Sequence, residues 1–366
     1  MLHVPVYREP GRFAGWLANY GIWSWGDEIV VGFTVGHLQT GAGFHARDDR
    51  RPFLPMQARS LDGGHTWTVA PVPCRTPGGR GFSADEHVRP ELSAQDALAR
   101  RLPHLPLPCP GNFDFTHPDF ALLCARTGLG GGTVSWFYVS QDRCRSWQGP
   151  FALPLFDQTG VEARTDYLIS GPMVCTLFLT AARADGAEGG GVFCARTLDG
   201  GRTFTLVSWI ARAETGHVIM PASARLAPKR IAVAVRAHDG RGGFEGGRHW
   251  IDLYLSEDDG LSWRWLAQPA PDTGRGGNPP ALTRLHDGRL CLTYGYRAAP
   301  FGIRARLSAD DGVTWGEEIT LRDDGGCHDL GYPRTVQRDD GTLVTVYYFN
   351  DQPDGERYIA ATLWKP

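Results

Sequence analysis

Short apolar runs, many of them alternating with polar residues, recur along almost the whole chain. They are rich in Val, Tyr, Phe and Thr and end at Gly, Asp or Pro, a pattern typical of β-strands. No helical period competes with them. We therefore predict strands at 21–25, 28–35, 134–139, 167–170, 174–180, 191–196, 204–209, 231–237, 250–255, 290–294, 303–307, 342–349 and 358–364.

Residues 72–112 interrupt this rhythm with a stretch rich in Pro and Gly. One helix is predicted there, at 93–101, with Ser93 as its N-cap. We interpret the stretch as an irregular insertion that decorates one face of the molecule and could act as a lid.

Five segments share the pattern Ser/Thr-x-Asp-x-Gly-x-Ser/Thr-aromatic: 60–67, 140–147, 197–204, 256–263 and 308–315. Only Cys144 departs from it at the Gly position. The Asp can accept hydrogen bonds from nearby backbone N–H groups and hold a tight turn, and the Gly permits a backbone conformation that other residues resist. The aromatic ring packs beneath the turn. These Asp residues are therefore expected to be structural.

The repeated Asp positions are 62, 142, 199, 258 and 310, so the steps are 80, 57, 59 and 52 residues. A strand-only repeat of this length is typical of β-propeller blades with four strands each. The insertion at 72–112 accounts for the long first step. Five marked blades and one unmarked closing blade predict an all-β, six-bladed propeller that occupies residues 1–366 as one unit.

Composition excludes several function classes. The formal net charge is −3 and no basic run is present, so nucleic-acid binding is not expected. No apolar stretch is long enough to span a bilayer. The first residues lack the apolar core of a signal peptide, which favours a cytoplasmic location, although a trimmed precursor would leave secretion open. The eight Cys are scattered without a Cys-x-x-Cys pair, so no disulfide framework, zinc site or cofactor is predicted.

Three arginines stand at comparable places in distant units of the chain: Arg8, Arg236 after an apolar strand, and Arg297 after another. Several guanidinium groups that point into one pocket would bind a carboxylate through bidentate, charge-assisted hydrogen bonds. For any one of them alone, an unrelated surface position is the simpler interpretation.

With these features together, the chain resembles the sialidase (neuraminidase) superfamily along its whole length. The repeated segments resemble the Asp-box of sialidases and related BNR-repeat propellers. Residues 7–10 (Tyr-Arg-Glu-Pro), 234–236 (Ala-Val-Arg) and 296–297 (Tyr-Arg) resemble the segments that carry the family's carboxylate-binding arginines. Residues 331–333 (Gly-Tyr-Pro) resemble the segment that carries its nucleophile.

The resemblance implies an exo-acting, retaining hydrolase that releases terminal sialic acid, or a related carboxylated keto-sugar, from glycoconjugates. Sialidases use a Tyr nucleophile instead of a carboxylate. By this resemblance Tyr332 attacks, and Asp49, with Asp48 as its competitor, protonates the leaving oxygen. The phenol needs a base, which is a Glu in the family.

At the matching place this chain has no carboxylate: residues 219–225 read Ile-Met-Pro-Ala-Ser-Ala-Arg, with Pro221 closest to the expected position. Glu214, Glu162 and Glu245 remain candidates for the base. Glu245 is favoured because its loop follows Arg236 and could curl over the pocket.

Further polar residues at strand entrances are candidates for recognising sugar hydroxyl and N-acyl groups: His117, Asp119, Arg164, Asp166 and Asn278. Loop-stabilising hydrogen bonds are the alternative for each. His117 has no second ligand at metal spacing. Two alternatives to a sialidase stay open: a propeller hydrolase or lyase for another anionic sugar, such as a uronic acid, and a non-catalytic glycan-binding propeller.

Overall fold

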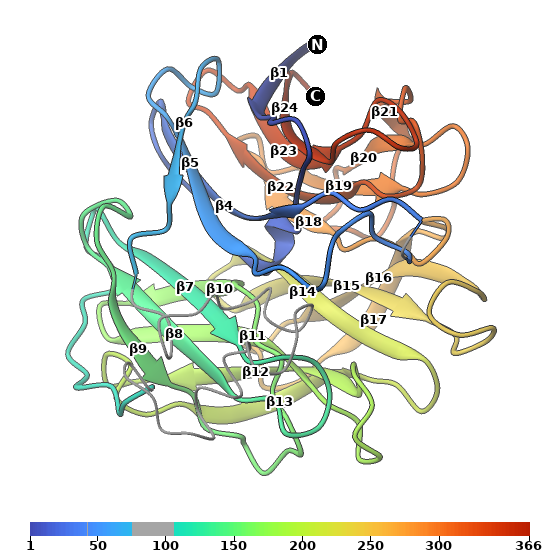
Figure 1. Cartoon of the computed structure of the whole chain (residues 1–366). Helices are drawn as coiled ribbons and strands as arrows, with labels where there is room; N and C mark the ends of the chain where they lie inside the picture. Colours follow the sequence, from blue (N-terminus) through green and yellow to red (C-terminus); the bar gives the residue numbers. More distant parts are fainter. Residues whose placement is uncertain (42, 75–105) are drawn as a thin grey trace.

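Six small antiparallel sheets surround a central axis in the computed structural model, which describes residues 1–41, 43–74 and 106–366 (Figure 1). This arrangement confirms the predicted all-β, six-bladed propeller. The strands, in spatial order within each sheet, are β2 (Arg12–Gly15), β4 (Glu28–His37), β5 (Leu54–Ser60) and β6 (Thr68–Pro71), with β3 (Ile22–Trp25) also on β4; β7 (Ala121–Arg126), β8 (Ser135–Ser140) and β9 (Gln148–Ala152); β10 (Tyr167–Gly171), β11 (Val174–Ala181), β12 (Gly191–Thr197) and β13 (Thr205–Arg212); β14 (His217–Ala227), β15 (Arg230–His238), β16 (His249–Ser256) and β17 (Arg264–Ala270); β18 (Ala281–Arg284), β19 (Leu290–Tyr296), β20 (Gly302–Ser308) and β21 (Ile319–Arg322); and β22 (Gly331–Gln337), β23 (Leu343–Phe349), β24 (Tyr358–Trp364) and β1 (Leu2–Tyr7).

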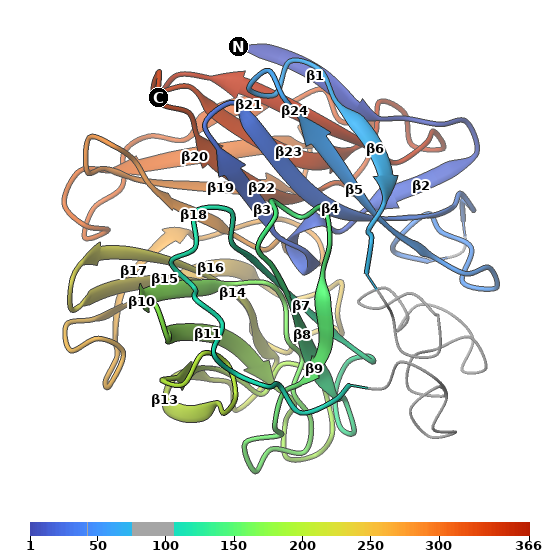
Figure 2. The ribbon, with the colours of Figure 1, turned by 90° about the vertical axis from the view of Figure 1, so that its left-hand side faces the viewer.

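The last of these sheets closes the ring, because it combines strands from the two ends of the chain. β1 pairs antiparallel with β24, with Leu2 opposite Leu363 and Val4 opposite Ala361. The two chain ends therefore lie side by side (Figures 1 and 2). The closing blade takes its outer strand from the start of the chain, so it has no turn between a third and a fourth strand. This explains why it carries no copy of the repeated motif.

In the other five blades, the repeated segment forms the turn between the last two strands. In the first copy, the Asp62 Oδ1 atom accepts hydrogen bonds from the N–H groups of His65, at 3.1 Å, and Thr66, at 2.9 Å. Its Oδ2 atom accepts one from the Thr66 hydroxyl at 2.6 Å. The N–H of Gly64, which has a φ of 96°, donates to the Ser60 hydroxyl at 2.8 Å. The carboxylate thus holds the turn.

Cys144 adopts the same backbone conformation as the glycines of the other copies. Its φ is 61°, and its N–H donates to the Ser140 hydroxyl at 2.9 Å. A residue with a Cβ pays a steric penalty in this region. Its side chain is fully buried in the adjoining core, so packing offsets part of that penalty.

The inner strands β7, β14, β18 and β22 were not predicted, and two of them, β14 and β22, contain a bulge. The pairing register shifts between Ile219 and Ala222 in β14 and between Gly331 and Arg334 in β22. At these bulges Met220 has a φ of 56° and Tyr332 a φ of 51°. An extra residue breaks the two-residue alternation by which a strand is recognised. The predicted helix at 93–101 lies outside the described residues, and among those described no helix has the length and apolarity to cross a membrane.

Candidate functional site

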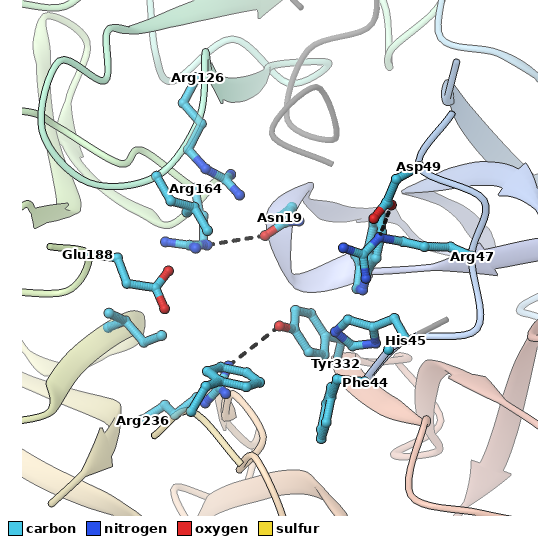
Figure 3. Close-up of a pocket in the computed structure, with 15 residues that line it drawn as sticks. Asn19, Phe44, His45, Arg47, Asp49, Arg126, Arg164, Glu188, Arg236 and Tyr332 are labelled. Carbon is cyan, nitrogen blue, oxygen red and sulfur yellow. Dashed lines mark hydrogen bonds and ion pairs between the residues drawn. The ribbon is translucent and has the colours of Figure 1, made fainter. Parts of the chain in front are cut away.

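A cavity of about 270 Å³ opens close to the axis of the propeller. Five of the six sheets, or the loops between their strands, contribute to it, so it exists only when the ring is assembled. Figure 3 shows its polar side chains converging from all sides. Its lining consists of Trp16, Asn19, Gly43, Phe44, His45, Arg47, Asp49, Arg126, Leu129, Arg164, Glu188, Ile219, Arg236, Phe244 and Tyr332.

Tyr332 lies on one wall, in the bulge of β22, and its strained backbone is held by Asn278. The Oδ1 atom of the fully buried Asn278 accepts the Tyr332 N–H at 2.9 Å, and its Nδ2 atom donates to the Leu330 carbonyl at 3.0 Å. Gly331, with a φ of 110°, leaves room for this amide, since a Cβ there would lie 2.2 Å from Nδ2. Asn278 is therefore a positioning residue for Tyr332.

Arg236 reaches the cavity from β15 and lies beside the Tyr332 hydroxyl. Its Nη1 atom is 3.4 Å from that hydroxyl and 3.8 Å from the Met220 sulfur, and its Nη2 atom donates to the Gly276 carbonyl. Burial lowers the pKa of Arg236 below its ordinary range. Its Nε–H, also buried, has no hydrogen-bond partner among the described residues. The site thus presents a buried cation with spare donor capacity.

Arg126 and Arg164 form a second basic wall. Arg126 ends β7, and Arg164 lies just before β10 and donates from Nε to the Asn19 side chain at 3.1 Å. Behind this wall, the fully buried Glu162 accepts N–H groups of Gly130 and Gly189, and its Oε2 atom is 3.7 Å from Arg164 Nη1. The guanidinium groups of Arg126, Arg164 and Arg236 together make the cavity attractive to anions.

Two carboxyl groups, those of Glu188 and Asp49, lie among the described residues that line the cavity. Glu188 stands in the loop between β11 and β12, where burial and then the charge of Glu162 raise its pKa. Asp49 stands in the loop between β4 and β5, half exposed, with its Oδ1 atom 2.7 Å from Arg47 Nε. They lie on opposite sides of the opening in Figure 3. A bound ligand would therefore meet a carboxyl group on each flank.

Arg297 lies behind Tyr332 and does not line the cavity. Its Nε donates to the Leu330 carbonyl at 3.0 Å, its Nη1 to the Gly277 carbonyl at 2.8 Å and its Nη2 to the Tyr348 hydroxyl at 2.6 Å. The protein itself thus engages all three nitrogens. Arg297 supports the wall that carries Tyr332, with its guanidinium 5.5 Å from the ring centre.

Asp329 anchors the loop that carries Asp49. This fully buried carboxylate accepts hydrogen bonds from the His45 ring at 2.6 Å, the Ala46 N–H at 2.9 Å, the Tyr348 hydroxyl at 2.9 Å and the Arg357 Nε at 2.9 Å. Burial lowers the pKa of His45 to about 4, so its ring is neutral near pH 7. The loop between β4 and β5 is therefore tied to the closing blade.

Of the other predicted site residues, Arg8 and Glu245 lie outside the cavity. Arg8 forms ion pairs with Asp351 and Glu356 on the closing blade. The three arginines expected in one pocket consequently do not converge: only Arg236 lines it. Glu245 is exposed and pairs with Arg275, whereas its neighbour Phe244 does line the cavity.

The remaining candidates have local partners. The ring of His117 accepts the Asp119 N–H at 3.2 Å, and the Asp119 carboxylate pairs with Arg143. Asp166 accepts hydrogen bonds from Ser223, and burial raises its pKa to about 7. Asp48 pairs with Arg50 and does not line the cavity.

Most contributors to the cavity were missed in the sequence, among them Asn19, Arg47, Arg126, Glu188 and Phe244. Arg126 had a usable signal, because it ends an apolar run as Arg236 does. Glu188 had none, since it lies in a Gly-rich loop whose path depends on the neighbouring blades.

Comparison with known proteins establishes the fold. No protein-family model matches the chain, and no curated protein matches it. Among solved structures, a protein of unknown function from Dyadobacter fermentans is 22% identical over 99% of this chain and 97% of its own, with a TM-score of 0.70. The Hadza microbial sialidase Hz136 is 15% identical, with a TM-score of 0.62; the match covers 96% of this chain and 66% of that one. The GH93 α-L-arabinofuranosidase of Fusarium graminearum is 14% identical over 98% of this chain and 94% of its own, with a TM-score of 0.58.

Proposed function

We infer that the protein is an exo-acting glycoside hydrolase that removes a terminal sugar bearing a carboxylate, sialic acid or a related acid, from a glycan. The observation that carries this proposal is the axial cavity, in which four arginines, one tyrosine and two carboxyl groups surround about 270 Å³. That volume suits a single sugar residue better than an extended chain. Structural likeness to a sialidase and to an arabinofuranosidase supports a glycan substrate.

The arginines would bind the carboxylate of the sugar. Arg126 and Arg164 on one wall and Arg236 on the other lie where a guanidinium can form charge-assisted hydrogen bonds with an anion. The free Nε–H of Arg236 is available for such a bond. An acidic sugar would bring a further negative charge to these three cations, which a neutral sugar cannot supply, and for this reason we favour an acidic substrate.

In the proposed reaction, the Tyr332 oxygen attacks the anomeric carbon while the glycosidic C–O bond breaks. Glu188 takes the phenolic proton, and Asp49 gives a proton to the leaving oxygen. Arg236, 3.4 Å from the phenolic oxygen, stabilises the negative charge that develops on it. Water then attacks the same carbon and gives its proton to Asp49, while the bond to Tyr332 breaks and Glu188 returns its proton to the phenolic oxygen, so configuration is retained. Asp49 lies 2.7 Å from Arg47, so the substrate must separate this ion pair before Asp49 can act on the leaving oxygen.

The test compares three aryl glycosides: a 2-O-aryl sialoside, an aryl β-glucuronide and a neutral aryl α-L-arabinofuranoside. We expect fluorophore release from an acidic glycoside by the wild type, no release by Tyr332→Phe, and normal release by Arg8→Ala, whose guanidinium lies outside the cavity. Preferred hydrolysis of the arabinofuranoside would refute the acidic substrate. Binding of an acidic glycan without turnover would make the protein a glycan-binding propeller, and turnover by Tyr332→Phe would exclude the nucleophile.

A further inference from the structure

Three histidines form a row across the blade made by β14 to β17. His217 begins β14, His238 ends β15 and His249 begins β16. His238 is the direct cross-strand partner of both others. Side chains of directly opposite residues project from the same face of a sheet. The rings accordingly lie together, with centres 5.1 Å apart for His217 and His238 and 4.2 Å apart for His238 and His249.

The row is buried, and its ring nitrogens converge. The three residues are 5%, 5% and 2% exposed, and one ring nitrogen from each lies within 4.8 Å of the other two. The Nε2 atom of His217 and the Nδ1 atom of His249 have no hydrogen-bond partner among the residues that the structure describes. Buried polar atoms are rarely left unpaired, so two unpaired ring nitrogens in a cluster of three histidines point to a ligand.

A purely structural role explains only part of this arrangement. The Nε2 atoms of His238 and His249 both lie 3.0 Å from the Gly246 carbonyl, so these rings support the loop between β15 and β16. The Nδ1 atom of His238 accepts the Gly240 N–H at 3.3 Å. These contacts engage both nitrogens of His238, so a metal ion there would replace one of the two hydrogen bonds. They involve neither of the unpaired nitrogens of His217 and His249.

The surroundings suit a metal ion that prefers imidazole. His217 and His249 are buried, and each offers a ring nitrogen without a hydrogen-bond partner among the described residues; a metal ion binds the neutral form of imidazole. Asp239 Oδ1, 3.6 Å from His238 Nε2, offsets some of the positive charge of Arg236. A separate cavity of about 720 Å³ borders His217, His238 and Asp239 and provides an entry path.

We propose that His217, His238 and His249 form a binding site for one divalent transition-metal ion of the zinc type, with a fourth position open to water or to Asp239. Tetrahedral Zn²⁺ with Zn–N bonds of about 2.0–2.1 Å places its nitrogens about 3.4 Å apart. The stacked rings of His238 and His249, whose planes differ by 12°, must therefore turn as well as approach for their nitrogens to point at one ion. Neutral imidazoles without a carboxylate cage favour such an ion over Ca²⁺ or Mg²⁺.

The site would act on the axial cavity through one loop. The loop between His238 and His249 carries Phe244, which lines the cavity and meets Phe44 edge-on at 5.2 Å. A metal ion would join the base of this loop to β14 and hold Phe244 in place. This consequence concerns the shape of the cavity and does not depend on the reaction assigned to it.

The experiment uses the whole chain, stripped with EDTA and titrated with Zn²⁺, Co²⁺ or Ca²⁺. We expect one equivalent of Zn²⁺ to bind and to raise the melting temperature, and Ca²⁺ to do neither. His217→Gln and His249→Gln should each weaken Zn²⁺ binding by at least about 100-fold. The exposed His286 supplies the matched control, since His286→Gln should bind Zn²⁺ as the wild type does.

Co²⁺ provides a readout that does not depend on the folding of a variant. The wild-type Co²⁺ complex should show tetrahedral or five-coordinate d–d absorption without a thiolate charge-transfer band. Absence of Zn²⁺ binding by the wild type would overturn the proposal. So would a thiolate band, binding that survives both His variants, or binding that is lost only in Cys327→Ser.

Discussion

Replacement of Asn278 by Ala should destabilise the protein strongly, because this one amide supports the strained turn before and at Tyr332. The substitution leaves the N–H groups of Tyr332 and Gly295 without their acceptor in a fully buried position. The Leu330 carbonyl keeps its hydrogen bond from Arg297 and contributes little to the loss. Each of the two orphaned N–H groups costs about 1–3 kcal/mol, so we expect a loss of about 2–6 kcal/mol in the free energy of unfolding.

The assay is urea unfolding followed by far-UV circular dichroism and tryptophan fluorescence, with agreement of the two probes as the check on two-state behaviour. Thr283→Ala, in the strand β18 that follows Asn278, is the matched control, because it removes one hydrogen bond, from the Thr283 hydroxyl to the Thr335 carbonyl. We expect it to cost about 1 kcal/mol. An Asn278→Ala loss no larger than that of the control would refute the assignment of Asn278 as the support of Tyr332.

Three further predictions concern charged groups. The hydroxyl and N–H of Ser262 lower the pKa of Asp258 to about 2 from an ordinary 3.8. The stability that ionised Asp258 contributes above pH 4 should therefore disappear as the pH falls towards 2, and Asp258→Asn should show a flatter dependence of the urea midpoint on pH over this range. Because the charge of Glu162 helps to raise the pKa of Glu188, Glu162→Gln should move the acidic limb of the kcat/KM profile to lower pH, while Glu188→Gln should abolish turnover; an unmoved limb would contradict the base role of Glu188. Asp329→Asn should release the loop at 43–53, measured as faster amide hydrogen exchange there than in β16, and unchanged exchange would contradict its anchoring role.

The fold could be predicted because its strongest signal is local and repeated. Each Ser/Thr-x-Asp-x-Gly turn contains its own hydrogen-bond partners, so five copies reveal five blades without any knowledge of long-range contacts. Not every strand was predicted: the inner strands β7, β14, β18 and β22 were missed, and in β14 and β22 the bulges at Met220 and Tyr332 break the alternation. In both strands, the irregularity occurs where the chain lies next to the cavity.

The candidate site was less accessible to prediction, because its geometry depends on partners far away in the chain. The pattern around Arg8 does not reveal that Asp351 and Glu356 will pair with it. Nor does the sequence around Glu188 show that its carboxyl group will lie near Arg126 and Arg236, which belong to the two neighbouring blades. The histidine row was invisible for the same reason: the spacing of 217, 238 and 249 matches no metal motif, and only the cross-strand register aligns these residues.

The pairing of β1 with β24 also determines when, during synthesis, the molecule can first bind a ligand in its cavity. During synthesis, residues 2–7 leave the ribosome first but find their strand partner only when residues 358–364 follow. Until then the blade that carries Tyr332 has no outer strand, and the loop that carries Asp49 lacks its anchor at Asp329 until that residue has emerged. A nascent chain therefore holds an open ring with an incomplete cavity. Ligand recognition should begin abruptly once residues 358–364 have emerged and paired with residues 2–7, instead of increasing blade by blade.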